Sequence, residues 1–330
     1  MTISTKKNVQ KLNNLEFYDF KPKLVDFKEE VISGLSKKEK TLAPKLFYDK
    51  KGSELFEQIV ELEEYYIPLI EKKLLMDNII SINEFMGENV SIIEPGSGSC
   101  EKVRRILSAH KSIKNYIPIE ISGDFLFHAA EKVAKEFPNI NIIPICADYL
   151  NNFSLPESLK KESKNKVIFF PGSSIGNYDS NDVIKVLKKF IELTDNQGGL
   201  LIGVDLKKDK DVLEKAYNDS KGITAQFNLN LLHRIKNELN VDLDVNNFEH
   251  QSIYNQEVGR IEMYIVSKKQ QSFMIDNLKI SFEKDEKIHT ENSYKYTVNE
   301  FRDIALSLGY KKHFYWTDEK EYFSINYFQL

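Results

Sequence analysis

The segment from residue 90 to residue 102, Val-Ser-Ile-Ile-Glu-Pro-Gly-Ser-Gly-Ser-Cys-Glu-Lys, constrains the fold more than any other part of the chain. An apolar run ends in an acid and two glycines, after which a helical pattern resumes. This order predicts a strand, a tight turn and the start of a helix. Gly96 and Gly98 allow the backbone to turn sharply and to approach a ligand. In an open α/β sheet, a nucleotide-like ligand is held at such a turn.

The ligand expected at this turn carries no phosphate. The third glycine of the dinucleotide fingerprint is missing, and the charge of Glu101 at the start of the expected helix would repel a pyrophosphate. The spelling Glu-x-Gly-x-Gly, from Glu94 to Gly98, instead suits S-adenosylmethionine, which is a cation. Taken alone, the turn is equally typical of an ordinary strand-to-helix loop. A nicotinamide dehydrogenase is the weaker alternative.

Three further apolar runs end in polar or glycine residues, at 116–120, 142–149 and 166–171. The first ends in Glu120, about 20 residues beyond the glycines, where such folds bind a ribose diol. The second ends in Asp148 and Tyr149. The third runs into Gly-Ser-Ser-Ile-Gly-Asn at 172–177. Because ligands of open α/β sheets lie at the carboxyl ends of strands, these residues predict one site.

Composition excludes several classes of function. The 330 residues carry a formal net charge of −4, which argues against nucleic-acid binding, because phosphate contacts need a basic face. The two cysteines, Cys100 and Cys146, lack CxxC spacing, so we expect reduced thiols and no metal site. The first 14 residues have no apolar core, and no run is long enough to span a membrane. We expect a cytoplasmic monomer.

The first half of the chain predicts an α/β domain. A helix is expected from Asp26 to Leu35, and Ser53 is expected to cap a second helix. From residue 90 to 205, strands and helices alternate, which predicts a Rossmann-like parallel sheet with helices on both faces. The apolar face of the second helix is expected to carry Leu55, Phe56, Ile59 and Leu62.

The pattern of expected helices and strands changes near residue 206. A helical part at 211–240 is followed by period-2 strands at 250–256, 259–267 and 271–282, which predict an antiparallel sheet. The tail predicts a helix at 298–308 and a hairpin of strands at 313–317 and 322–328, which could complete the first sheet. We therefore expect an S-adenosylmethionine-binding domain of residues 1–205 with 295–330, and a smaller α+β substrate-binding lobe of residues 206–294.

Blocks of residues spread in order over about 41–320 carry a family resemblance. They include Phe-Tyr-Asp at 47–49, Glu-Tyr-Tyr at 64–66, the turn at 94–102, Gly-Ser-Ser-Ile-Gly-Asn at 172–177, Gly-Ile-Thr-Ala-Gln-Phe-Asn at 222–228, Arg-Ile-Glu-Met at 260–263 and Thr-Glu-x-Ser-x-Lys at 290–295. Together they resemble the histidine Nα-methyltransferases of ergothioneine biosynthesis. The resemblance implies trimethylation of the α-amine of L-histidine by S-adenosylmethionine, giving hercynine, without a metal.

The resemblance also implies roles for individual residues. For the cofactor, the glycine-turn motif would hold the methionine end, Glu120 the ribose, and Asp148 with Tyr149 the adenine. The matching motif residues are Glu94, Gly96, Ser97, Gly98 and Lys102.

For the acceptor, the resemblance implies that Glu291 and Ser293 bind imidazole, and that Tyr48 orients the amine and tolerates its growing positive charge. The other implied substrate residues are Tyr65, Asn177, Tyr217 and Met263. Taken singly, each is more typical of a packed core or a solvated turn than of a binding site. Their joint occurrence favours one small amino acid as substrate, with Tyr48 and Asn177 next to the reacting amine.

Some residues depart from the family pattern. Glu120 stands where the family usually has Asp, Ala147 where it commonly has Gly, and Pro95 and Cys100 vary the first turn. None of these differences affects a residue that is implied to bind the methyl acceptor. Two alternatives stay open, namely an enzyme that methylates another amino acid or an aromatic primary amine, and a binding homologue without catalysis. The pair Glu291 and Ser293 favours imidazole over indole.

Overall fold

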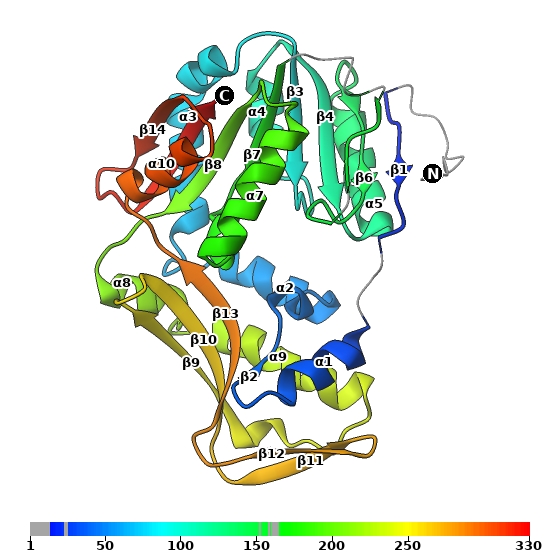
Figure 1. Cartoon of the computed structure of the whole chain (residues 1–330), viewed down its shortest axis with the longest axis vertical. Coiled ribbons are helices and arrows are strands. Elements are labelled where there is room, and N and C mark those ends of the chain that lie inside the picture. Colours follow the sequence, from blue (N-terminus) through cyan, green and yellow to red (C-terminus); the bar gives the residue numbers. More distant parts are fainter. Residues whose placement is uncertain (1–13, 23–25, 152, 158, 160–164) are drawn as a thin grey trace. The chain divides into compact units, whose positions relative to one another are not determined.

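The computed structural model describes residues 14–22, 26–151, 153–157, 159 and 165–330 (Figure 1). The sequence-based statement that the first 14 residues lack an apolar core concerns mostly residues 1–13, which lie outside the described residues. The chain divides into two compact units. Unit 1 comprises Met1–Leu24, Leu69–Leu206 and Tyr296–Leu330, and unit 2 comprises Val25–Pro68 and Lys207–Lys295.

The division differs from the sequence-based one in residues 25–68, which belong to unit 2 rather than to the first domain. The reason is that a strand and a helix of this segment pair and pack with later parts of the chain. Strand β2 (Lys40–Thr41) pairs in parallel with β13 (Lys287–Tyr294), and helix α2 (Lys50–Val60) packs on α9 (Ile223–Glu238). A short N-terminal segment thus completes a sheet and a helical layer whose other members come much later in the sequence.

Unit 1 is built on one large sheet in the order β1-β6-β4-β3-β7-β8-β15-β14, with β5 pairing β4. Its strands are β1 (Tyr18–Asp19), β3 (Val90–Pro95), β4 (Ile113–Glu120), β5 (Asn141–Ile142), β6 (Ile145–Cys146), β7 (Asn165–Phe170), β8 (Gly199–Asp205), β14 (Lys312–Thr317) and β15 (Phe323–Gln329). The pairs from β1 to β8 are parallel, and the C-terminal hairpin pairs antiparallel through β15 and β8. This confirms the predicted Rossmann-like sheet and its completion by the C-terminal hairpin.

Strand β3 is buried over its whole length because it lies in the middle of the sheet, between β4 and β7. The chain leaves β3 toward β4 and β6, and it returns to the other side of β3 with β7. Ligands of open α/β sheets bind at such a change of direction, beyond the carboxyl ends of the strands. The glycine turn after β3 and the segment 172–177 after β7 both lie there.

Helices connect and accompany these strands, and α7 crosses the front of the sheet at β7 in Figure 1. They are α3 (Ile67–Met86), α4 (Arg104–Ala109), α5 (Gly123–Glu136), α7 (Ser180–Leu193) and α10 (Val298–Ser307), with a short 3-10 helix η2 (Ser174–Asn177). The run predicted as one strand at 142–149 is instead two short strands, β5 and β6. Pro144 separates them because proline has no N–H for the sheet ladder.

Unit 2 combines helices with a four-stranded sheet in the order β2-β13-β10-β9 and a two-stranded sheet of β11 and β12. Its remaining elements are α1 (Phe27–Leu35), η1 (Pro44–Phe47), α8 (Lys210–Ala216), η3 (Val245–Asn247), β9 (Phe248–Asn255), β10 (Arg260–Ser267), β11 (Gln271–Ile275) and β12 (Leu278–Phe282). The predicted strand at 271–282 is therefore a hairpin, which reverses where Asp276 adopts a φ of 49°.

Two local expectations in unit 2 have a clear outcome. The predicted helix at Asp26–Leu35 is confirmed as α1, which begins after Asp26 and is capped by the Asp26 carboxylate. The prediction that Ser53 caps the next helix is wrong. Helix α2 begins earlier, at Lys50, because the Asp49 carboxylate accepts the Gly52 N–H at 2.7 Å and so provides the cap. Among the described residues, no helix is long and apolar enough to span a membrane.

Candidate active site

The glycine turn after β3 has the conformation that a close ligand contact requires. Gly96 and Gly98 have φ values of 68° and 52°, in the left-handed region that favours glycine. A Cβ built at either position would have no other atom within 4 Å, so the side of the turn is open. Among the described residues, the buried Ser97 hydroxyl finds no hydrogen-bond partner. An open turn with an unpaired buried hydroxyl suits a small polar ligand group.

Glu94 lies beneath this turn rather than on it. Its side chain is 2% exposed, and its carboxylate accepts a hydrogen bond from the Tyr116 hydroxyl on β4. Burial raises the pKa of Glu94 to about 8, although the Tyr116 hydrogen bond and the charge of Lys102 oppose this shift. The carboxyl group is thus held inside unit 1 as part of the base of the turn.

Glu120, at the end of β4, connects its strand to the glycine turn. Its Oε2 accepts the Gly98 N–H at 3.3 Å, and its Oε1 accepts the Ile121 N–H at 2.7 Å. The sequence-based prediction assigned Glu120 to a ribose. The structure places its carboxylate directly beside the turn. A ribose hydroxyl bound there would either replace these backbone N–H groups as the hydrogen-bond donor or share the carboxylate with them.

Asp148 and Tyr149 follow the end of β6. Asp148 accepts hydrogen bonds from the Leu150 N–H at 3.1 Å and from the Asn151 amide at 2.7 Å. The Tyr149 hydroxyl lies 2.9 Å from the Tyr178 hydroxyl, and burial raises the pKa of Tyr149. Tyr149 is therefore a neutral ring held against the segment that follows β7, as an adenine-stacking or adenine-edge residue needs to be.

Lys102 has a partner that the sequence analysis did not identify, namely Glu71 on α3. The Lys102 ammonium donates to Glu71 Oε2 at 2.9 Å, and Glu71 Oε1 accepts the Gly172 N–H at 2.5 Å. Glu71 is 3% exposed. An acid at an otherwise core-facing helix position is the only available signal.

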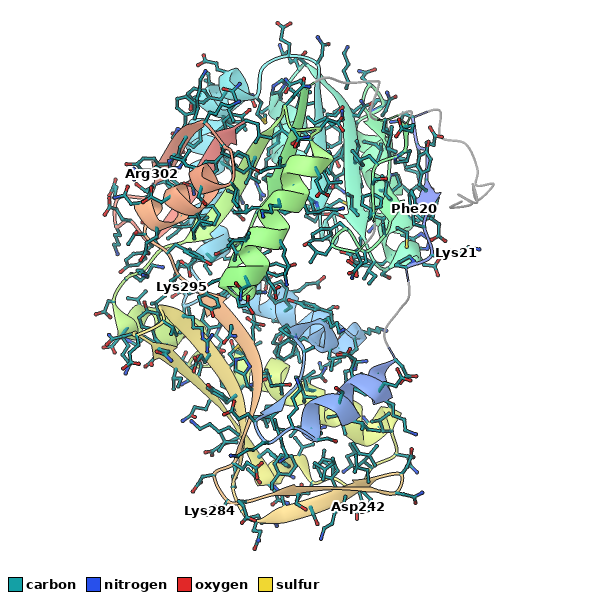
Figure 2. All side chains as sticks on the ribbon, viewed as in Figure 1. Phe20, Lys21, Asp242, Lys284, Lys295 and Arg302 are labelled. Carbon is teal, nitrogen blue, oxygen red and sulfur yellow. The ribbon has the colours of Figure 1, made fainter. Side chains whose placement is uncertain are left out.

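In unit 2, three predicted or neighbouring side chains form a buried hydrogen-bonded cluster. The Tyr217 hydroxyl donates to Ser293 Oγ at 2.8 Å. The Lys295 ammonium donates to Ser293 Oγ at 2.8 Å and to Tyr217 Oη at 3.1 Å. Lys295 directly follows β13 and is labelled in Figure 2. Because Ser293 Oγ accepts two hydrogen bonds, its own proton is left to donate, which makes Ser293 a donor toward a ligand.

Glu291 and Met263 lie on neighbouring strands of the same sheet. Met263 of β10 is paired with Glu291 of β13, next to an irregularity in the register between Met263 and Tyr264. Met263 is 2% exposed. Burial raises the pKa of Glu291 to about 7, and the charge of Lys295 opposes the shift. The cluster therefore offers a carboxyl acceptor and a hydroxyl donor, two residues apart on β13.

The two other predicted tyrosines of unit 2 lie near this cluster. The Tyr65 ring packs edge-on against Tyr217, with ring centroids 6.0 Å apart. Tyr48 is 51% exposed and packs against Phe56 and Phe227. Burial of its hydroxyl and, next, the charge of Glu291 raise the pKa of Tyr48 above its ordinary value. Tyr48 thus stays a neutral phenol, suited to orienting an amine rather than to removing its proton.

His250 and Asn228 support the backbone of Tyr217, although His250 lies in no motif and Asn228 is only the last residue of the block 222–228. His250 Nε2 lies 2.9 Å from the Tyr217 carbonyl oxygen, and His250 Nδ1 lies 2.9 Å from the Asn228 amide nitrogen. Burial lowers the pKa of His250, so the ring is neutral. A neutral ring that donates from Nε2 and accepts at Nδ1 fixes the backbone of Tyr217.

Asn177 differs from the other predicted acceptor residues, because it belongs to unit 1. It is the last residue of η2 and is exposed. The structure therefore brings together Tyr65, Tyr217 and Ser293 by direct contact, and Glu291 and Tyr48 by electrostatic interaction. The role of Asn177 at the amine stays a prediction.

The residues of unit 1 fit S-adenosylmethionine. The open turn and the unpaired Ser97 hydroxyl can receive the methionine end, together with Lys102. The Glu120 carboxylate, which accepts the Gly98 N–H of this turn, suits a cationic ligand.

Comparison with known proteins supports the same assignment. Residues 27–330 match the family of histidine-specific, S-adenosylmethionine-dependent methyltransferases. The chain is 31% identical to the histidine Nα-methyltransferase of Mycolicibacterium smegmatis and 32% identical to that of Mycobacterium tuberculosis. Each alignment covers 91% of this chain and 93% of the relative. It is 24% identical to the L-tryptophan methyltransferase of Psilocybe serbica, over 89% of this chain and 90% of that protein. The chain belongs to the family of histidine-specific, S-adenosylmethionine-dependent methyltransferases.

Proposed function

We propose that the chain transfers three methyl groups from S-adenosylmethionine to the α-amine of L-histidine and releases hercynine. The observation that carries the proposal is the buried cluster on β13, in a chain of a histidine-specific family. There Glu291 can accept a hydrogen bond and Ser293, two residues further on, can donate one. A neutral imidazole carries one N–H and one unprotonated nitrogen, so it matches this pair.

The match explains why other amino acids would bind poorly. Both Glu291 and Ser293 are largely buried, so a side chain without the matching donor and acceptor would leave them unpaired. Discrimination of this kind is stronger than discrimination by shape alone, because each unpaired buried polar group costs about 1–3 kcal/mol. An indole has an N–H for Glu291 but no ring acceptor for Ser293.

Methyl transfer needs alignment and an unprotonated amine. S-adenosylmethionine supplies an electrophilic methyl group, which is transferred as its bond to sulfur breaks toward the sulfur. The amine has a lone pair only after it loses a proton, so one proton must leave before each transfer. Tyr48 remains a phenol because its pKa is raised, and it therefore orients the nitrogen through its hydroxyl while water takes the proton. We propose the same orienting role for the Asn177 amide.

The proposal is tested by incubation of the chain with S-adenosylmethionine and a panel of amino acids, followed by mass spectrometry. We expect histidine to gain three methyl groups and the other amino acids to gain none at comparable rates. Trimethylated tryptophan or another amine would instead assign the chain to a different acceptor. Cofactor binding without methylation of any acceptor would identify a binding homologue.

We also propose that the chain acts as a cytoplasmic monomer on free histidine and not on nucleic acid. The formal net charge of −4 is unsuited to a phosphate backbone. Light scattering during size-exclusion chromatography tests the monomer, and a particle of twice the mass would overturn it.

A further inference from the structure

Glu71 is a buried acid on α3 to which neither the sequence motifs nor the proposed mechanism gives a role. Only 3% of the residue is exposed. A carboxylate in such a place is costly unless it is paired and hydrogen-bonded. Glu71 meets both conditions with two different partners, because Oε2 accepts from the Lys102 ammonium at 2.9 Å and Oε1 accepts from the Gly172 N–H at 2.5 Å.

Two glycines make this arrangement possible. A Cβ on Gly203 of β8 would lie 2.6 Å from Glu71 Oε1, and a Cβ on Gly172 would lie 2.4 Å from Lys102 Nζ. Both distances are far below a normal contact, so a side chain at either position would displace the pair. Gly172 also has a φ of 77°, which favours glycine. The carboxylate and the ammonium are thus fitted against the backbone that follows β7 and against β8.

We propose that Glu71 is a positioning residue for the amino-acid end of the cofactor. By holding one N–H of the Lys102 ammonium and the Gly172 N–H, it fixes Lys102 beside the glycine turn, and the other N–H groups of the ammonium are left for the carboxylate of the ligand. The proposal rests on the proposed function, in which Lys102 binds the methionine end. Glu71 acts through Lys102 and the segment 172–177 and does not touch the reacting atoms.

The two acceptor contacts of Glu71 explain why even a close analogue should fail. In Glu71→Gln, the amide has one oxygen, which can serve Lys102 or Gly172 but not both. Its NH₂ group then faces the remaining donor. In Glu71→Asp, both oxygens and the charge are kept, but the shorter side chain cannot reach both partners. Either substitution therefore releases Lys102 or the Gly172 N–H.

The experiment compares two ligands in calorimetric titrations. S-adenosylhomocysteine carries the amino-acid end, whereas 5′-methylthioadenosine has the same nucleoside and a thioether but lacks that end. We expect Glu71→Gln and Glu71→Asp to raise the Kd of S-adenosylhomocysteine about 10-fold or more, and to change the Kd of 5′-methylthioadenosine less than about 2-fold. In a Lys102→Met background, Glu71→Gln should change the Kd of S-adenosylhomocysteine less than about 2-fold, because the ammonium through which Glu71 acts is absent.

The matched control is Asp195→Asn, which removes a carboxylate that pairs with another buried lysine of unit 1, Lys166. It should leave both titrations unchanged. Equal weakening of both ligands by the Glu71 variants would indicate a purely structural role, and unchanged binding of S-adenosylhomocysteine would remove any role; either result overturns the inference. If the unaltered chain binds neither ligand, the proposed function fails instead.

Discussion

The two acids proposed for the nucleoside end of the cofactor in unit 1 and the hydroxyls proposed for the acceptor in unit 2 differ in what holds them. In unit 1, Glu120 and Asp148 accept hydrogen bonds from backbone N–H groups at strand ends. In unit 2, the hydroxyls of Tyr217 and Ser293 are held by each other and by the buried ammonium of Lys295. The first arrangement depends on the fold, whereas the second depends on a few particular side chains.

This difference predicts how strongly substitutions should weaken the binding of each ligand. An acid that accepts from solvent-exposed backbone N–H groups can be removed with little disturbance, because water replaces it as the acceptor. A group held by a network of side chains cannot, because each removal leaves buried polar atoms unpaired. Substitutions in unit 2 should therefore have the larger effects, and they should act on histidine and not on the cofactor.

The largest effect is expected for Glu291→Ala. It removes the carboxyl acceptor for the imidazole, and a hydrogen bond to a charged group contributes about 1.5–3 kcal/mol. We expect kcat/KM for histidine to fall about 10- to 100-fold, mainly through KM, while the Kd of S-adenosylmethionine changes less than about 2-fold. Steady-state kinetics and titration calorimetry measure these two quantities.

The matched control for Glu291→Ala is Glu286→Gln, which removes a carboxylate paired with Lys40 just before the same strand. It should leave histidine kinetics close to normal. Unchanged kinetics in Glu291→Ala would show that β13 does not recognise the substrate side chain.

The next largest effect is expected for Lys295→Met. The substitution removes the donors to Ser293 and Tyr217 and the positive charge that lowers the pKa of Glu291. The pKa of Glu291 should then rise above about 7, so the carboxylate that binds imidazole should form only at higher pH. The acidic limb of the pH profile of kcat/KM should move to higher pH. An unmoved limb, with an equal loss at every pH, would mean that Lys295 does not act on Glu291.

A smaller effect is expected for Glu120→Ala in unit 1. We expect the Kd of S-adenosylmethionine to rise about 10-fold, which corresponds to one lost hydrogen bond of about 1–2 kcal/mol. The KM for histidine at saturating cofactor should stay within about 2-fold of normal. Glu131→Ala, which removes an exposed acid of α5 paired with Lys135, serves as the control. Cofactor affinity equal to that of the control would place the ribose elsewhere.

The smallest effect concerns stability. Burial raises the pKa of Glu94 from an ordinary value of 4.5 to about 8, so folding favours its protonated form. This contribution is complete below about 4.5 and is lost as the pH rises through about 8. Glu94→Gln resembles the protonated acid and does not titrate. Relative to the unaltered chain, its melting temperature should therefore increase by a few degrees between about pH 6 and pH 9. A constant difference in differential scanning calorimetry would contradict the assigned pKa.

The same difference between the units decided what the sequence could predict. Strand β3 and the turn with Gly96 and Gly98 are continuous in sequence, so periodicity and glycine spacing were sufficient to predict them. Strand β13, which carries Glu291 and Ser293, was not predicted. Its spelling Lys-Ile-His-Thr-Glu-Asn-Ser-Tyr is mostly polar, and the irregular register beside Met263 breaks the alternation of buried and exposed residues.

Contacts between distant segments were also beyond the sequence patterns. Lys295 was visible within a family block, but only the fold brings it to Tyr217, which is 78 residues away. Glu71 lies 101 residues from Gly172, so their hydrogen bond could not be inferred from the sequence around α3. The assignment of residues 25–68 to unit 2 likewise follows from the pairing of β2 with β13, which no local signal reveals.

The most direct test of the central claim, that the chain trimethylates the α-amine of histidine, locates the methyl groups in the product. The chain is incubated with L-histidine and S-adenosylmethionine carrying ¹³C in its methyl group, in the presence of EDTA, and the product is examined by NMR. The account predicts a single methyl resonance from three equivalent methyl groups on the α-nitrogen. Methylation of an imidazole nitrogen, or a loss of turnover in EDTA that a divalent ion restores, would contradict it.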